Sequence, residues 1–213
     1  MQKLSNAEIS KAKGVIREKL AQFEGQKILV VGDVGLDEYV TGGVKRISPE
    51  APVPVVEVQN REFRVGLAAN VAQNVHSMGG LGLMVGVVGA DASAKDLGAL
   101  MKTNGVSDQH LIVDKDRPTT RKVRVMSGQH HIVRVDYEER KFLDAKLEKA
   151  LFDKFTSLLG SSSGVILQDY GKGVLSEDLS QKLIVAARAE KKTCGGRPAS
   201  HDTGSILQRR RPN

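Results

Sequence analysis

The pattern of apolar and polar positions predicts alternating strands and helices along most of the chain. Short apolar runs are typical of buried strands, whereas apolar residues spaced three or four positions apart are typical of helices. These patterns predict strands at 27–31, 83–88 and 164–168, and helices at 5–24, 68–78, 93–104, 144–159 and 176–190. The alternation favours an α/β fold with a mainly parallel sheet flanked by helices.

Polar residues mark the ends of the predicted helices. Ser5 and Glu8 have the spacing of a capping box, and the helix that follows carries one apolar face and ends at Gly25. Ser93 and Asp96 are expected at the start of the helix at 93–104.

A proline-rich segment predicts a strand at the edge of a sheet. Pro49, Pro52 and Pro54 lie close together and precede a run in which Val and Glu alternate. Proline has no N–H group for a ladder hydrogen bond and favours extended backbone before it, so this strand cannot be central. Because it lies between Gly-containing turns at 32–37 and 66–70, we expect it to cover a ligand site.

Two further segments break the α/β alternation. Residues 119–126 and 131–137 alternate with period two and are joined by a turn-forming Ser-Gly-Gln-His sequence, which predicts an antiparallel hairpin. His130 and His131 lie at its turn and are expected to be exposed, without a metal.

The pattern changes again near the C-terminus. Residues 191–194 could begin a strand, but Gly195, Gly196 and Pro198 are expected to interrupt it. We therefore expect 1–194 to form the N-terminal part of an α/β domain whose C-terminal half is missing, and 195–213 to form an atypical, disordered tail.

Composition indicates a soluble globular protein. Of the 213 residues, 40% are hydrophobic and 27% charged, and no apolar run approaches the ~18 to 20 residues of a membrane span. With no signal-peptide pattern, a cytoplasmic location is expected. A single cysteine, Cys194, argues against disulfide scaffolds and zinc modules.

The net charge of +7 does not by itself indicate a nucleic-acid partner. Residues 195–213 hold four arginines against one acid, so much of the excess is local, and aromatic residues make up only 4% of the chain. An anionic small-molecule substrate fits the charge equally well.

Candidate ligand-binding groups lie at the two Gly-containing turns. Asp33 and Asp37 follow a predicted strand, and either could simply cap a turn; the carboxylate of Asp37 could instead accept hydrogen bonds from sugar hydroxyls. The N–H groups from Gly66 onward and the amide of Asn70 could bind an oxygen-rich ligand, or the segment could be ordinary helix-start packing. Neither turn, nor the Gly171-Lys172-Gly173 loop, matches a P-loop or a dinucleotide fingerprint.

The hairpin carries candidate phosphate-binding side chains. Lys122 and Arg124 share one strand face, as do Arg134 and Asp136 on its partner. They could be solvated surface charges or a cationic cluster that receives a phosphate.

Taken together, these motifs resemble the kinase domain of the bacterial heptose 7-phosphate kinases, which are ribokinase-like sugar kinases. The resemblance runs from about residue 25 to 193, and its most specific part is the Ile-Ser-Pro-Glu-Ala-Pro-Val-Pro-Val run at 47–55. The other matching segments are Gly32–Asp37, Gly66–Asn70, Lys122–Val125, Arg134–Asp136 with Glu138-Glu139, and Asp169–Gly173.

The resemblance implies transfer of a phosphoryl group from ATP, with Mg²⁺, to the anomeric hydroxyl of D-glycero-D-manno-heptose 7-phosphate on the route to ADP-heptose and lipopolysaccharide. Asp37, Gly66 and Asn70 match sugar-binding positions. Segments 39–60 and 118–137 match a lid that commonly forms a homodimer contact. We infer that Lys122, Arg124, Arg134 and Asp136 grip the existing phosphate or close the lid.

Two departures from that family affect the expectation. Leu67 stands where the family usually repeats glycine, and the Gly-Ala-Gly-Asp motif with the catalytic base does not occur in this sequence. No catalytic residue is therefore assigned, and the chain is expected to be an inactive kinase fragment. The alternatives are a non-catalytic sugar-phosphate-binding or dimerising module, or another ribokinase-like sugar kinase.

Overall fold

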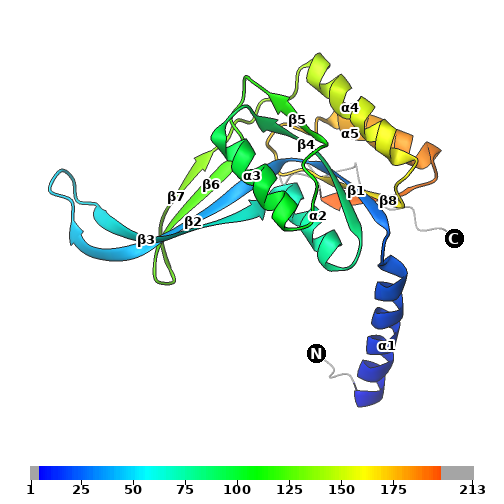
Figure 1. Ribbon diagram of the computed structural model, residues 1–213, viewed down its shortest axis with the longest axis horizontal. Coiled ribbons are helices and arrows are strands. Elements are labelled where there is room, and N and C mark those ends of the chain that lie inside the picture. Colours follow the sequence, from blue (N-terminus) through cyan, green and yellow to red (C-terminus); the bar gives the residue numbers. More distant parts are fainter. Residues whose placement is uncertain (1–4, 198–213) are drawn as a thin grey trace.

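The computed structural model describes residues 5–197 and contains a parallel sheet that forms the centre of an α/β body (Figure 1). All neighbouring strands run parallel, in the order β5-β4-β1-β8-β9. The strands are β1 (Lys27–Gly32), β4 (Leu81–Gly89), β5 (Leu111–Asp114), β8 (Gly164–Gln168) and β9 (Thr193–Arg197).

Helices cover both faces of this sheet, so the predicted α/β fold is confirmed. On one face α4 (Ala145–Leu159) and α5 (Glu177–Ala189) pack against alternate strand residues, with Phe155 fully buried. On the other face α2 (Leu67–Ser77) and α3 (Ala92–Thr103) bury residues such as Leu97 and Met101. Strands buried on both faces are continuously apolar, which explains why short apolar runs marked them in the sequence.

Side-chain caps fix the starts of three of these helices. Asp91, Asp144 and Ser176 each accept a hydrogen bond from a backbone N–H in the first turn of α3, α4 and α5. The expected start of α3 at Ser93 is wrong, because Asp91 is the capping residue and Ser93 lies inside the helix.

A second sheet projects from the body, and we call it the projecting sheet (Figure 1). Its strand order is β3-β2-β6-β7, with β2 paired antiparallel to β3 and parallel to β6. Its strands are β2 (Val34–Ile47), β3 (Pro54–Gly66), β6 (Arg121–Ser127) and β7 (His130–Tyr137). The predicted antiparallel hairpin is the pair β6–β7.

The proline-bearing strand lies at the edge of the projecting sheet, as predicted. Pro54 is the first residue of β3, and Pro49 and Pro52 lie in the connection from β2. The prediction of a turn at 32–37 is wrong, because only Asp33 separates β1 from the long strand β2. Gly35, Gly42 and Gly43 interrupt the alternation of side chains in β2 and so conceal a strand in the sequence.

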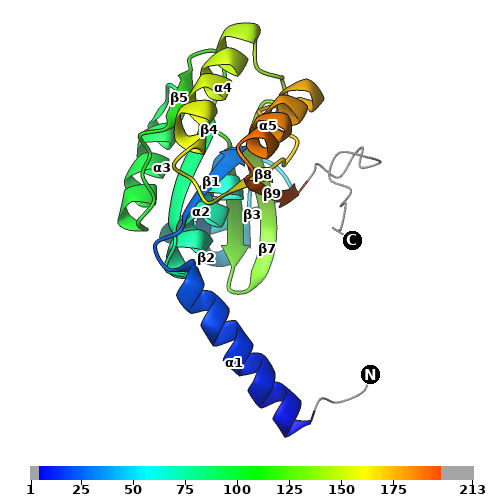
Figure 2. The same cartoon turned by 90° about the vertical axis from the view of Figure 1, so that its right-hand side faces the viewer.

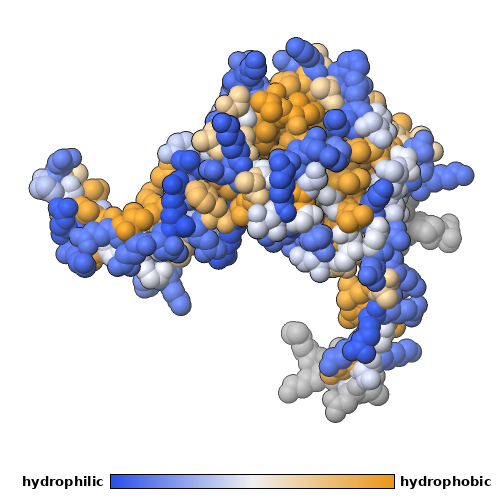
Figure 3. All heavy atoms as spheres, in the orientation of Figure 1, coloured by the Kyte–Doolittle hydropathy of each residue, from blue (hydrophilic) through white to orange (hydrophobic). Residues whose placement is uncertain are grey.

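The first helix, α1 (Asn6–Phe23), extends away from the α/β body (Figures 1 and 2). Its predicted capping box is present, with the Ser5 hydroxyl accepting from the Glu8 N–H and the Glu8 carboxylate accepting from the Ser5 N–H. Several of its apolar residues are exposed, for example Ile16 at 58% and Leu20 at 45%. Figure 3 shows hydrophobic surface among the hydrophilic surface of this helix. The amphipathic pattern therefore predicted the helix correctly, but the structure leaves much of its apolar face exposed.

The sheet also contains strands that the sequence pattern did not predict. β5 is only four residues long, and β9 continues through Gly195 and Gly196 to Arg197, so the expected interruption by glycines is wrong. A Cβ atom on Gly196 would lie 2.0 Å from the carbonyl oxygen of Leu167, so glycine permits the close strand pairing here. The rest of the expected tail, 198–213, lies outside the described residues.

Candidate functional site

The carboxyl ends of β1 and β8 are held together by a buried aspartate. Asp33 accepts hydrogen bonds from the backbone N–H groups of Tyr170 at 2.8 Å, Lys172 at 3.2 Å and Val174 at 3.1 Å. Burial raises the pKa of the Asp33 carboxyl, although the three N–H donors oppose the increase. Asp33 therefore caps the loop after β8, and this capping role matches the simpler of its two sequence interpretations.

The junction between β3 and α2 brings Gly66 next to the other candidate aspartate. Gly66 pairs with Gly35 across β2 and β3, and a Cβ atom at Gly66 would lie 2.9 Å from Oδ2 of Asp37. The next residue, Leu67, has a left-handed φ of 56°, a conformation that costs a non-glycine residue about 1–2 kcal/mol. The backbone at this junction is therefore both crowded and strained.

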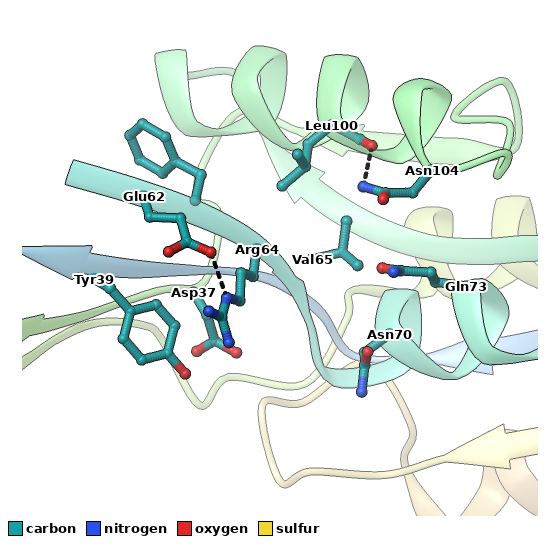
Figure 4. A pocket seen from close by; sticks show the side chains of 10 residues that line it. Asp37, Tyr39, Glu62, Arg64, Val65, Asn70, Gln73, Leu100 and Asn104 are labelled. Atoms are coloured by element: carbon teal, nitrogen blue, oxygen red, sulfur yellow. Dashed lines mark hydrogen bonds and ion pairs between the residues drawn. The ribbon is translucent and has the colours of Figure 1, made fainter. Parts of the chain in front are cut away.

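Asp37 and Asn70 line one open pocket of about 480 Å³ between the projecting sheet and helices α2 and α3 (Figure 4). Asp37 comes from β2, while Asn70 lies in the first turn of α2. The pocket has a mainly polar wall, completed by Tyr39, Glu62, Phe63, Arg64, Val65, Gln73, Leu100 and Asn104. Carboxylate, amide and guanidinium groups of this kind can bind the hydroxyl groups of a sugar.

Several of these lining residues were missed by the sequence reasoning. Gln73 follows Asn70 by three positions on α2, so helical spacing alone could have placed it beside Asn70. Asn104 comes from the end of α3, and its amide nitrogen donates to the carbonyl oxygen of Leu100 at 2.7 Å. No local sequence signal connects α3 with Asp37.

One face of the projecting sheet collects the predicted charged residues. Directly paired residues of neighbouring strands share a face, and Lys122 of β6 pairs with Asp37 on one side and with Asp136 on the other. Arg124 pairs with Arg134 in the same way, two positions along β6. The structure therefore brings all four predicted hairpin residues onto the face that carries Asp37.

The charged groups on this face are already paired with one another. Nη1 of Arg124 lies 2.5 Å from Oδ1 of Asp37, and the guanidinium also lies over the Tyr39 ring, 5.2 Å from its centroid. Arg134 contacts Asp136 at 2.8 Å. Asp37 thus has a cationic partner that can hold its carboxylate in position for a hydroxyl group.

Glu138 is the centre of a second charged group, which links the end of β7 to the loop after β8. Oε2 of Glu138 lies 3.0 Å from Nζ of Lys122 and 2.7 Å from Nζ of Lys172, and Oε1 contacts Arg140 at 3.0 Å. Burial alone would raise the pKa of Glu138, but the hydrogen bonds from Lys172, Lys122 and Arg140 outweigh it and lower the pKa to about 2. Lys172 lies in the Gly171-Lys172-Gly173 loop, whose sequence does not match a P-loop.

The opposite face of the projecting sheet is largely apolar, with one buried ion group at its root. Glu38 is 3% exposed and contacts Arg61 at 2.5 Å and Arg121 at 3.6 Å. The Arg121 guanidinium lies 4.3 Å from the centroid of the Tyr137 ring. Farther along β7 the valines Val133 and Val135 are 49% and 42% exposed.

Within residues 5–197 there is no group of three His, Cys, Asp or Glu side chains that could hold a metal ion. His130 and His131 are exposed at the hairpin turn, as expected from the sequence. None of the helices in the described part of the chain has the length and apolar character needed to cross a membrane.

Sequence comparison places most of the chain within one group of proteins. A profile of the pfkB family carbohydrate kinases matches residues 26–202. The chain is 44% identical over 171 residues to the bifunctional protein HldE of Azorhizobium caulinodans, covering 80% of this chain and 36% of that protein. It is 42% identical over 167 residues to the same-named protein of Helicobacter pylori, covering 78% and 36%. The chain thus spans about a third of the length of these curated relatives.

Solved structures share the fold at low sequence identity. A carbohydrate kinase from Agrobacterium tumefaciens superimposes with a TM-score of 0.61 at 19% identity, covering 80% of this chain and 53% of that one. The Arabidopsis thaliana ribokinase complexed with ribose and ATP gives a TM-score of 0.55 at 15% identity, covering 81% and 53%. At these identities the similarity shows a ribokinase-like fold.

Proposed function

Because this chain belongs to the pfkB family of carbohydrate kinases, we propose that it binds D-glycero-D-manno-heptose 7-phosphate as the sugar-binding part of a kinase that transfers a phosphoryl group from ATP to the anomeric hydroxyl of that sugar, and that this chain by itself is inactive. The heptose is supported by the family-specific Ile-Ser-Pro-Glu-Ala-Pro-Val-Pro-Val run and by the similarity to the HldE proteins. The product would be the 1,7-bisphosphate used on the route to ADP-heptose and lipopolysaccharide, in the cytoplasm.

The convergence of Asp37 and Asn70 on one polar pocket is the observation that carries this proposal. The Asp37 carboxylate, held by Arg124, accepts hydrogen bonds from sugar hydroxyls, and the Asn70 amide can both donate and accept. Gly66 leaves the space that the Asp37 carboxylate needs and lets the sugar approach the backbone. Together these groups orient the sugar ring.

The projecting sheet would act as a lid over this pocket. Its charged face carries Lys122, Arg124, Arg134 and Asp136, which would grip the phosphate of the sugar or hold the closed lid. A lid that excludes water favours transfer of the phosphoryl group to the sugar over its loss to water. The exposed valines of the opposite face, including Val133 and Val135, support a homodimer through the lid.

We propose ATP as the phosphoryl donor and Mg²⁺ as the ion that accompanies it. The ribokinase of Arabidopsis thaliana was solved with ribose and ATP, which supports ATP as the phosphoryl donor for this fold. Mg²⁺ would accompany the ATP phosphates and neutralise their charge.

Isothermal titration of the 213-residue chain with heptose 7-phosphate tests the proposed function. Asp37→Ala removes an ionised acceptor, and such hydrogen bonds contribute about 1.5–3 kcal/mol, so affinity should fall roughly 10- to 100-fold. Asp153→Ala removes an exposed aspartate paired only with Lys149 and should leave affinity unchanged. The proposal fails if the unaltered chain does not bind the sugar, or if both variants bind equally well. Turnover in the presence of ATP would contradict the expectation that this chain is an inactive kinase fragment, whereas binding without turnover agrees both with that expectation and with a non-catalytic sugar-phosphate-binding module.

A further inference from the structure

We propose that the ammonium groups of Lys122 and Lys172 form the subsite for the phosphate that the sugar substrate already carries, and that the Glu138 carboxylate competes with this phosphate for them. This inference rests on the proposed function, because it assigns one end of the same substrate. Lys172 and Glu138 lie in the loop after β8 and at the end of β7, so the subsite extends beyond the charged residues of the hairpin.

The geometry of the two lysines is that of a site for an anionic oxygen. Both ammonium groups contact the same atom, Oε2 of Glu138, at 3.0 Å and 2.7 Å. Their side chains are only 15% and 11% exposed, so water screens them less than it screens surface lysines. An oxygen held between two ammonium groups is a position that a phosphate oxygen can occupy.

Positive charge exceeds negative charge around this position. Lys122, Lys172, Arg134 and Arg140 surround the two carboxylates of Asp136 and Glu138. Lys122 donates to Asp136 at 3.3 Å and to Glu138 at 3.0 Å, and Lys172 contacts Glu138 at 2.7 Å. Since an ammonium group has three N–H donors, these contacts engage two donors of Lys122 and one of Lys172. The cluster can therefore bind a dianionic phosphate. Binding becomes more favourable when the Glu138 carboxylate moves away from the two ammonium groups.

The loop that carries Lys172 is held in place independently of any substrate. The Lys172 N–H donates to the buried carboxylate of Asp33, and the Lys172 carbonyl oxygen lies 3.5 Å from Nη1 of Arg117. The side chain of Arg117 is 8% exposed and contacts Asp114 at 2.9 Å. A side chain on such a rigid support loses little freedom when it binds a ligand.

The subsite also lies beside the sugar-binding residues. Lys122 is the cross-strand neighbour of Asp37, so the phosphate position adjoins the carboxylate proposed to bind the sugar hydroxyls. The two arginines of the hairpin on this face are less suited to hold the phosphate. Arg124 is engaged by Asp37, and the side chain of Arg134 is 57% exposed.

Titration with two sugars tests the subsite. Heptose 7-phosphate and the same heptose without phosphate are titrated into the unaltered chain, Lys172→Met and the control Lys182→Met, an exposed lysine paired with Glu148 on α4. We expect Lys172→Met to weaken binding of the phosphorylated sugar roughly 10- to 100-fold and to change binding of the unphosphorylated sugar less than twofold. The control should change neither. Equal losses for both sugars, or no loss for either, would overturn the subsite while leaving the proposed function standing.

A second variant separates a phosphate subsite from a purely structural ion group. Glu138→Gln removes the competing charge, so it should bind heptose 7-phosphate several-fold more tightly and the unphosphorylated sugar as before. If Glu138 only supports the fold, this variant would bind the phosphorylated sugar no better or less well, and the inference would be overturned. Thermal unfolding monitored by circular dichroism confirms that each variant is folded. If the unaltered chain binds neither sugar, the proposed function fails and the subsite fails with it.

Discussion

The Asp37 carboxylate lies so close to Gly66 that a Cβ atom on the glycine would be 2.9 Å from Oδ2 of Asp37. The same Cβ atom would lie 3.1 Å from the carbonyl oxygen of Gly35, which is part of the backbone. Gly66 has an ordinary extended φ of −120°, so steric room rather than conformational freedom requires glycine here. The proposed sugar-binding carboxylate can therefore occupy its position because glycine at position 66 has no Cβ atom.

Gly66→Ala should therefore displace Asp37 and weaken binding of heptose 7-phosphate at least about tenfold, since overpacking costs roughly 1–3 kcal/mol. Isothermal titration measures the affinity, and circular dichroism the fold. The control is Gly14→Ala in α1, where the new methyl group would meet nothing within 4 Å. Unchanged affinity in a folded Gly66→Ala chain would mean that Asp37 does not need its observed position.

Acid should weaken the ion group around Glu138. The pKa of this carboxyl is lowered to about 2 in the folded chain, below its value in the unfolded chain, so its stabilising contribution is present above the unfolded pKa. The contribution is lost as the pH falls from about 5 towards 2. The urea midpoint of the unaltered chain should thus fall more between pH 7 and pH 3 than that of Glu138→Gln.

The surface variant Glu177→Gln is the control for that experiment, because Glu177 is exposed at the start of α5. Its urea midpoint should fall with acid as much as that of the unaltered chain. Identical pH dependence in all three chains would show that the contacts of Glu138 with Lys122 and Lys172 do not stabilise the fold.

Leucines in α1 and α3 should differ sharply in their contribution to stability. Leu97 is fully buried between α3 and the parallel sheet, and replacing a buried leucine by alanine costs about 2–5 kcal/mol. Leu20 on α1 is 45% exposed, so Leu20→Ala should cost less than about 1 kcal/mol. Urea unfolding measures both values, and a cost for Leu20→Ala that equals the cost for Leu97→Ala would mean that α1 packs against a partner in solution.

Dimerisation through the apolar face of the projecting sheet predicts sensitivity to charge at Val135. Val135→Lys would place a cation among valines, and sedimentation velocity should show a dimer for the unaltered chain and a monomer for the variant. Val185→Lys on α5, at a valine that is 58% exposed, should remain dimeric. A monomeric unaltered chain, or a dimer that tolerates Val135→Lys, would contradict this interface.

The sequence predicted the elements whose patterns are local. Apolar runs identified β1, β4 and β8 because these strands are buried on both faces, and the prolines placed β3 at an edge because proline cannot donate to a ladder. Strand β2 was missed because Gly35, Gly42 and Gly43 obscure its alternation. Strand β9 was misjudged for a similar reason, since the glycines at 195 and 196 suggested a break but permit close pairing with β8.

The candidate site was only partly predictable, because its residues come from distant parts of the chain. Asp37, Gly66 and Asn70 stood out through the glycines and the motif around them. The partners of Asp37 and Lys122 depend on the register of β2, β6 and β7, which no local pattern specifies. Lys172 reaches Glu138 from the loop after β8, which Asp33 holds against the end of β1.

A crystal structure of this chain with heptose 7-phosphate is the most direct test of the account. It should show sugar hydroxyl groups within hydrogen-bond distance of the Asp37 carboxylate and the Asn70 amide, with the sugar beside Gly66. A sugar bound elsewhere, with Asp37 and Asn70 untouched, would contradict the assignment of this pocket as the sugar-binding site.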